Sequence, residues 1–322
     1  MTGLVLFLYA LNTLSDALKE MAGERLKVFL DRFTSNMFKG ILSGIIVTVL
    51  LDSASVVIIM TIALVNSGAL NFRQAMGIVM GANIGTTFSS QIFALDIGEY
   101  AALPIVTGFV MMFFLKKAFY VQLGKVIFGF GLIFFGLFTM EGAVEPLKHS
   151  QYFVGWLHSL ESTWKGLSTG AVVTILIQSS SATVGMVIGL AAQKMITLSA
   201  AIAVVLGAEI GTCADTLVAS VGRSKAAVKT GLFHLLFNIA TILLAMLLLP
   251  YFTQLVQLVS RGMPVQQTIA NAHMLFNGLG VLVMLPFIGV FDRLLEKLVR
   301  QESKSVAYSC GVLLLIYSTR QG

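Results

Sequence analysis

Charged residues are scarce in this chain: Asp, Glu, Lys and Arg make up 11% of its 322 residues, whereas soluble domains contain about 25%. Hydrophobic residues account for 57% of the sequence, and the mean hydropathy is +0.90. This composition excludes a soluble enzyme and a nucleic-acid-binding protein, in spite of the net charge of +6. It predicts an all-α polytopic membrane protein.

Cysteine is scarce as well. The chain has only Cys213 and Cys310, and two separated thiols indicate neither a disulfide framework nor a metal site. The first residues contain no basic leader and no small-residue cleavage site, so we expect no removable signal peptide. The segment from Gly3 to Leu8 also resembles residues 129–137, which are internal and cannot be a leader.

What the chain does contain is an internal repeat. A shift of 126 positions, without a gap, aligns Gly81–Thr86 with Gly207–Thr212 and Ser53 with Ser179. The matched residues are small or hydroxylated and lie inside apolar sequence, which in duplicated membrane proteins points to a transport site between the halves. We expect repeat 1 over residues 1–118, repeat 2 over 121–250, an additional transmembrane helix and an interfacial helix over 251–305, and a tail over 306–322.

Two apolar stretches are interrupted near their middle by polar residues. In the stretch 40–67, an apolar arm of 12 residues, Gly40–Leu51, precedes Asp52-Ser53-Ala54-Ser55. Twelve helical residues rise about 18 Å, which is short of the hydrocarbon core of about 30 Å. We therefore predict a re-entrant helical hairpin with a polar tip, and a second one over 166–192 with Gln178–Ser181 at its tip. Bent backbone at that depth is stable only where it lines protein or a water-filled cavity.

The stretches 75–95 and 200–220 are long enough to cross a membrane, but each contains the motif G-A-x-I-G-T. A glycine weakens a helix by about 1 kcal/mol relative to alanine. We therefore predict a discontinuous transmembrane helix in each half, facing the hairpin tips. Thr86, Thr87, Thr212 and Asp215 would offer oxygen atoms around the loosened turns.

The distribution of basic residues predicts the topology. If repeat 1 crosses at 3–18, 75–95 and 101–115, an odd number of crossings gives the two repeats an inverted topology. Sixteen Lys and Arg residues then fall on one side of the membrane and four on the other. The positive-inside rule makes the basic side cytoplasmic, so we expect an inner (plasma) membrane protein with its N-terminus outside.

Three carboxylates, Asp52, Glu209 and Asp215, fall within the predicted membrane segments. An ionisable group there costs about 2.5–3.5 kcal/mol on insertion scales and by default marks an ion path or proton relay. A carboxylate that is hydrogen-bonded in a polar interface, or kept protonated by burial, is the structural alternative. We favour the functional interpretation for Asp52 and Glu209, and Asp215 stays open.

The motif H-x-x-F-N also occurs twice, as His234–Asn238 and as His273–Asn277. Residues four apart lie on one face of a helix. The favoured role is interhelical hydrogen bonding that docks these spans on the core, with proton transfer as the alternative.

The tip Gln178–Thr183 after Val172–Thr174, a following G-A-x-I-G-T helix and H-x-x-F-N together resemble the type II sodium–phosphate cotransporter family. Gly81–Thr87 carries the same resemblance in the first half, and the likeness covers about residues 1–300. It implies a secondary active transporter, not an enzyme, that takes up inorganic phosphate by alternating access with sodium ions as co-transported ligands and no other cofactor. A second copy of the chain is a further candidate partner.

The resemblance and the motifs together give the candidate site. Substrate binding is assigned to Ser53, Ser55, Gln178, Ser179, Ser180 and Ser181. Ion binding is assigned to Asp52, Asn83, Thr86, Thr87, Glu209, Thr212 and Asp215. Sodium in particular is assigned to Asp52, Gln178, Asn83, Thr86, Glu209 and Thr212.

The chain departs from the family pattern at two of these positions. The first tip has Asp52 where the family has Gln, and Glu209 replaces the Asn of the second G-A-N-I-G-T. Two like charges 6 Å apart repel by about 2.8 kcal/mol at an effective dielectric of 20, so phosphate near Asp52 requires a neutralising cation or proton. The alternatives are another small ion or solute, with sodium or proton coupling through Asp52 and Glu209, and a membrane-embedded hydrolase, which the duplicated serine cluster disfavours.

Overall fold

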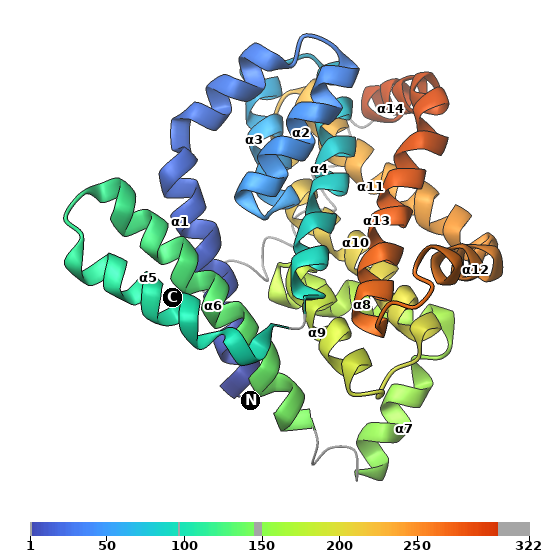
Figure 1. The fold of residues 1–322 in the computed structure, drawn as a ribbon. Helices are drawn as coiled ribbons and strands as arrows, with labels where there is room; N and C mark the ends of the chain where they lie inside the picture. Colours follow the sequence, from blue (N-terminus) through green and yellow to red (C-terminus); the bar gives the residue numbers. More distant parts are fainter. Residues whose placement is uncertain (1, 96, 145–149, 302–322) are drawn as a thin grey trace, which may run out of the picture.

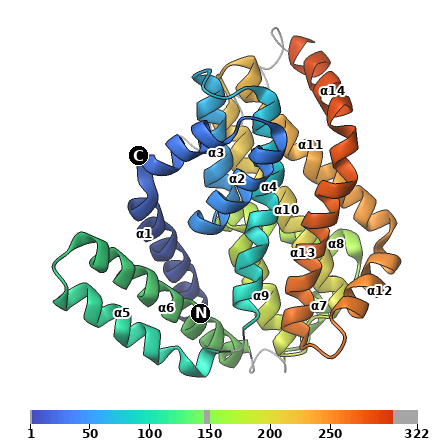
Figure 2. The same cartoon turned by 45° about the horizontal axis from the view of Figure 1, so that its top comes forward.

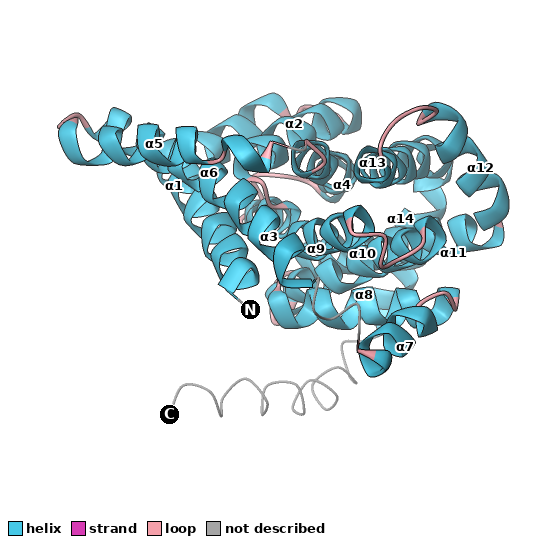
Figure 3. Ribbon diagram, turned by 60° about the horizontal axis from the view of Figure 1, so that its bottom comes forward, coloured by secondary structure: helices cyan, strands magenta, loops and turns pink. Residues whose placement is uncertain are grey.

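The computed structural model describes residues 2–95, 97–144 and 150–301, and all regular structure in these ranges is helical (Figure 3). The all-α prediction is therefore confirmed. The elements in chain order (Figure 1) are α1 (Thr2–Phe33), α2 (Met37–Leu51), α3 (Ala54–Asn66), α4 (Phe72–Phe93), η1 (Gly98–Tyr100), α5 (Ala102–Phe114), α6 (Ala118–Val144), α7 (Gln151–Ser159), α8 (Thr163–Ile177), α9 (Ser180–Ala192), α10 (Leu198–Ser220), α11 (Lys225–Leu247), α12 (Leu249–Val259), α13 (Val265–Met284), η3 (Leu285–Phe287) and α14 (Ile288–Gln301). The predicted tail, 306–322, lies outside the described residues.

Two helical hairpins occupy the stretches where hairpins are predicted. The α2–α3 pair turns at Asp52–Ser53 and the α8–α9 pair turns at Gln178–Ser179. In each hairpin the first arm has 15 residues and the second has 13, so the arms rise about 22 Å and about 20 Å. Such arms are apolar but shorter than a full membrane crossing.

The two helices that carry G-A-x-I-G-T, α4 and α10, are continuous. The prediction that they are interrupted is therefore wrong. Their glycines serve close packing instead: a β-carbon added at Gly81 would lie 2.0 Å from the carbonyl oxygen of Ile41, and one at Gly207 would lie 2.0 Å from that of Leu167. Small residues that let two backbones touch are the usual basis of helix packing in membranes.

Within the described ranges, four helical runs are long and apolar enough to cross a membrane, or five if α4 and α5 count as one bent span. The four are 118–140, 198–220, 225–247 and 265–299. Helix α5 has 13 residues and makes an angle of 78° with α4. By itself it rises only about 20 Å, so the expected separate crossing at 101–115 is too short, and α1, which contains the expected crossing at 3–18, is not among the four runs.

The two hairpins pack against α4 and α10 at the centre of the molecule. Because α4 and α10 carry the motif G-A-x-I-G-T, they are called the motif helices below. Helix α3 packs against both α4 and α10, and α9 likewise packs against both α10 and α4. The α2–α3 hairpin lies in the upper half and the α8–α9 hairpin in the lower half (Figures 1 and 2). Helices α11 and α13 lie together on one side of this centre, and α5 lies on α6 on the opposite side (Figure 1). Each hairpin therefore contacts the motif helix of both halves.

The glycine contacts give a test of the packing. Gly81→Ala and Gly207→Ala each place a methyl group against a backbone carbonyl, and overpacking of this kind costs about 1–3 kcal/mol. Thermal unfolding in detergent should show a clearly lower midpoint for each variant. Gly278→Ala is the matched control, because a β-carbon there meets no atom within 4 Å and alanine favours a helix. Equal midpoints for the three variants would contradict the packing role.

Candidate functional site

The two hairpin tips have the same backbone conformation. Asp52 and Gln178 both adopt the left-handed region, with φ of 52° and 60°. The serine that follows is extended in each case, with φ of −156° at Ser53 and −151° at Ser179. Both serines then cap the second arm, because Ser53 Oγ accepts from the amide of Val56 and Ser179 Oγ accepts from that of Ala182. Each second arm thus begins at the tip with a hydroxyl and free amide groups.

The remaining tip residues line the first turn of each second arm. Ser180 and Ser181 are each 7% exposed at the start of α9, and Ser55 is half-buried at the start of α3. Gln178, in contrast, is exposed. The tip serines therefore lie where hydroxyl and amide groups converge at a helix N-terminus, which favours an anion.

Asp52 is held by the motif helix of its own half. Ser89 of α4 donates a hydrogen bond to its carboxylate. In the 126-residue register Asp52 corresponds to Gln178, and Ser89 corresponds to Asp215. Each half therefore has one carboxylate in this pair of positions, at the tip in the first half and on the motif helix in the second. Asp215 is half-buried on α10.

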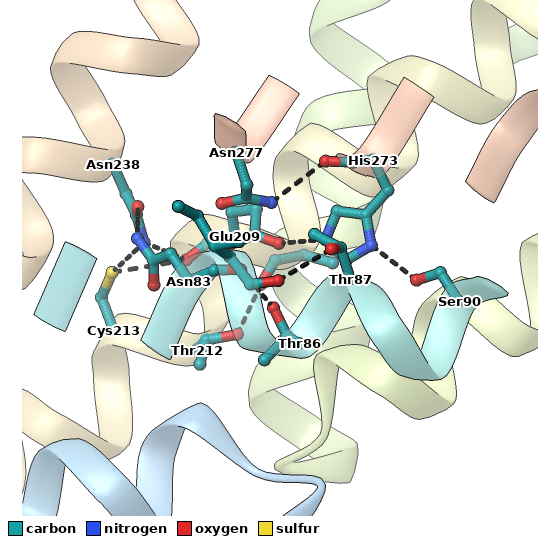
Figure 4. A network of polar contacts seen from close by, with 12 residues as sticks. Asn83, Thr86, Thr87, Ser90, Glu209, Thr212, Cys213, Asn238, His273 and Asn277 are labelled. Atoms are coloured by element: carbon teal, nitrogen blue, oxygen red, sulfur yellow. Dashed lines mark hydrogen bonds and ion pairs between the residues drawn. The ribbon is translucent and has the colours of Figure 1, made fainter. Parts of the chain in front are cut away.

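A buried amide on α11 joins the two motif helices (Figure 4). Asn83 Nδ2 donates to Asn238 Oδ1 over 2.7 Å, and Asn238 Nδ2 donates to the carbonyl oxygen of Glu209 over 3.1 Å. Asn83 is 1% exposed and Asn238 is fully buried. Two predicted ion-binding positions, one from each half, thus lie on either side of one side chain.

Glu209 also contacts the second H-x-x-F-N helix. Its Oε1 is hydrogen-bonded to His273 Nε2 over 2.6 Å, and His273 Nδ1 is hydrogen-bonded to Ser90 Oγ over 2.6 Å. The exposed fraction is 3% for Glu209 and 1% for His273. A buried carboxylate needs a charged or hydrogen-bonding partner, and His273 provides it (Figure 4).

The first H-x-x-F-N helix uses its histidine in a similar way. His234 Nδ1 is hydrogen-bonded to Thr216 Oγ1 over 2.9 Å, and His234 Nε2 to Asn238 Nδ2 over 3.2 Å. The prediction that these motifs dock their helices on the core is confirmed for both helices. A part in proton transfer stays a prediction.

Three motif threonines donate their hydroxyl protons to their own helix. Thr86 donates to the carbonyl oxygen of Asn83, Thr87 to that of Ile84, and Thr212 to that of Ala208. Each hydroxyl oxygen keeps lone pairs that can coordinate a cation. The amide oxygen of Asn83 is also an acceptor, because its contact with Asn238 uses the nitrogen. These oxygens can therefore serve as hard ligands of the kind sodium takes.

Sequence reasoning did not single out Ser89, Ser90 or Thr216, although each contacts a candidate residue or a motif histidine. A signal was present in the register, since Ser90 is aligned with Thr216 and both lie four residues after a motif threonine. Extending the repeat comparison beyond G-A-x-I-G-T would have found this pair of hydroxyl residues.

The sequence of this chain is similar to those of known and predicted phosphate-transport proteins. The sequence model described as Na⁺/Pi-cotransporter matches residues 6–142 and 149–284. The chain is 32% identical to the uncharacterized protein YqeW of Bacillus subtilis (strain 168), over 92% of this chain and 97% of that protein. It is 25% identical to a candidate inorganic phosphate export protein, YjbB, of Escherichia coli (strain K12), over 94% of this chain and 55% of that protein. No solved structure matches the chain.

A shorter match links the chain to animal proteins. It is 39% identical over 95 residues to sodium-dependent phosphate transport protein 2A of Ovis aries, which is 29% of this chain and 15% of that protein. Neither these relatives nor the described residues support a second copy of the chain as a partner.

The amide bridge makes a prediction about stability. Asn238→Ala leaves the buried amide nitrogen of Asn83 without its partner, and an unsatisfied buried donor costs about 1–3 kcal/mol. It also removes one hydrogen bond to the carbonyl oxygen of Glu209, which still accepts from Cys213 Sγ. We expect a lower thermal unfolding midpoint in detergent. Asn277→Ala is the matched control, since Asn277 has the same place in its motif and donates only to a carbonyl of its own helix. If the two alanine variants are equally stable, Asn238 does not bridge the motif helices.

Proposed function

Because the chain belongs to the Na⁺/Pi-cotransporter family, we propose that it is a secondary active transporter that takes up inorganic phosphate, driven by sodium, by alternating access. The observation that carries this proposal is the pair of matching tips, each starting an apolar helix of 13 residues that packs on both α4 and α10. We place the chain in the cell inner membrane with its N-terminus outside. This placement counts α1, α4 and α5 as crossings in spite of the short length of α5, because the basic residues then gather on one side.

Phosphate would bind at the start of α3 and α9. Ser53 and Ser55 contribute from the first tip, and Ser179, Ser180 and Ser181 from the second, with Gln178 at the rim. The helix N-termini add partial positive charge, and serine hydroxyls can donate to phosphate oxygens. These groups suit an anion that must be released again, since none of them carries a full positive charge.

Sodium would bind on the oxygens beside the tips. Asp52 supplies a carboxylate, and Asn83, Thr86, Thr87 and Thr212 supply amide and hydroxyl oxygens that their own hydrogen bonds leave free to accept. Gln178, Glu209 and Asp215 complete the set from the second half. A cation that binds first neutralises Asp52 and removes a repulsion of about 2.8 kcal/mol at about 6 Å and an effective dielectric of about 20, so phosphate binds after sodium.

The two halves give the proposal its mechanism. We assign repeat 1 to residues 1–118 and repeat 2 to 121–250, in inverted topology, with 251–305 as supporting helices. The hairpins are the re-entrant elements, and their arms of 15 and 13 residues support this. The tips lie against α4 and α10, so a shift of the hairpins against these two helices would open the site to one side at a time.

The direction of transport has a second candidate. The E. coli relative is named a candidate phosphate exporter and aligns with 94% of this chain, which favours outward movement of phosphate as the alternative to uptake. The two extra carboxylates, Asp52 and Glu209, give two further alternatives. The substrate is another small ion or solute, or protons are coupled to transport through these carboxylates.

Uptake of radiolabelled phosphate into proteoliposomes tests the proposal. An inward sodium gradient should raise the initial rate severalfold over an equal potassium gradient. In Asp52→Asn the sodium concentration for half-maximal uptake should rise about tenfold, which corresponds to about 1.4 kcal/mol, because an amide replaces the carboxylate. Vesicles preloaded with phosphate, under a gradient of either sign, distinguish export from uptake.

Asp16→Asn is the control for Asp52→Asn. Asp16 is 75% exposed and pairs with Lys19 at the surface, so its neutralisation should leave the sodium dependence unchanged. An absence of sodium stimulation in the wild type would overturn the proposed coupling, and an equal effect of both substitutions would remove Asp52 from the sodium site.

A further inference from the structure

We propose that α13 completes the site beside Glu209 in the same way that α11 completes it beside Asn83. His273 is the positioning residue for Glu209. Asn277 occupies the position in α13 that Asn238 occupies in α11, but it makes no bridge to a motif helix in the wild type. This inference rests on the proposed function where it concerns sodium, and on geometry alone where it concerns the helices. It assigns a place beside the site to His273, which lies outside the repeated segments, and leaves Asn277 outside the site in the wild type.

The hydrogen bonds of the two histidines are related by the repeat. Thr216 of α10 contacts His234 Nδ1, and Ser90 of α4, which is aligned with Thr216, contacts His273 Nδ1. Helices α11 and α13 are thus each hydrogen-bonded, through a histidine, to a hydroxyl group on one of the two motif helices, α10 and α4 respectively. Each then reaches the third motif position on the other motif helix: α11 reaches Asn83 through Asn238, and α13 reaches Glu209 through His273.

The neighbours of α11 and α13 are also related by exchange of the two repeats. Among its neighbours α11 has α10, α4 and α3, and α13 has α4, α10 and α9. Exchanging α4 with α10 and α3 with α9 therefore converts the surroundings of α11 into those of α13. In the register of the sequence, α11 corresponds to α5, but α5 carries Gly108 and Met112 where α11 carries His234 and Asn238. Helix α5 lies on α6 instead, and α13 holds the equivalent central position.

The contacts of α11 and α13 differ in the length of the motif side chain that each helix meets. Asn83 is short and meets α11 through the amide of Asn238, with the histidine behind it. Glu209 is one methylene longer and contacts His273 directly. The amide of Asn277 is then not needed as a bridge, and it donates to the carbonyl of His273 on its own helix over 3.3 Å. Asn277 is 2% exposed, so it already lies inside the core, one helical turn after His273 on the same helix (Figure 4).

This arrangement predicts that Asn277 becomes important only when residue 209 is shortened. In Glu209→Asn the second motif reads like the first, and the amide of Asn277 should turn to bridge His273 and the shorter side chain introduced at position 209. Asn277→Ala alone should change the sodium concentration for half-maximal phosphate uptake less than about twofold. The double variant Glu209→Asn/Asn277→Ala should raise it at least about tenfold above Glu209→Asn alone. The thermal unfolding midpoint should fall by more than the sum of the two single effects.

Glu209→Gln is the matched control, because glutamine keeps the length that reaches His273. Adding Asn277→Ala to Glu209→Gln should therefore change neither the sodium dependence nor the additivity of the unfolding midpoints. The inference is overturned if Asn277→Ala has the same effect in the Asn and Gln backgrounds, or if the midpoints are additive in both. Absence of sodium-driven uptake by the wild type would instead contradict the proposed function, and the midpoints would still decide the inference.

Discussion

The close contact between each hairpin and its motif helix is the constraint on which the rest of the structure depends. Gly81 and Gly207 let the backbones of α4 and α10 touch the carbonyls of Ile41 and Leu167. This contact fixes the first arm of each hairpin against a continuous helix. The tip at Asp52 then lies beside Ser89 of that helix, and the second arms extend to the motif helix of the other half.

The buried polar groups are a second constraint, and they determine the positions of α11 and α13. In an apolar environment an unpaired amide or carboxylate is costly, so the polar residues of α4 and α10 determine where α11 and α13 can lie. Asn238 satisfies Asn83 and the backbone at Glu209, and His273 satisfies the side chain of Glu209. The same residues that we assign to ion binding thus hold the two halves together, so an ion bound there would change the packing of these helices.

The sequence was sufficient to predict the helical class, the two hairpins and the docking role of the H-x-x-F-N motifs, because each depends on local pattern and on the repeat. It failed where a residue has two opposite uses. The glycines of G-A-x-I-G-T weaken an isolated helix but allow close packing, and only the position of Ile41 and Leu167 decides between these effects. The contacts of Ser89 and Ser90 join residues far apart in the chain. The position of α13 on the motif helices, where the repeat would place α5, depends on tertiary packing that a local sequence pattern does not contain.

The central claim is that one site is formed between the two tips and the two motif helices. Cryo-electron microscopy of the chain in lipid nanodiscs, with sodium and phosphate present, tests it most directly. The account predicts density for a tetrahedral anion between the first turns of α3 and α9, within hydrogen-bonding distance of Ser53 and Ser179–Ser181, at mid-membrane depth. Tips located at the lipid headgroups, or anion density away from both, would contradict it.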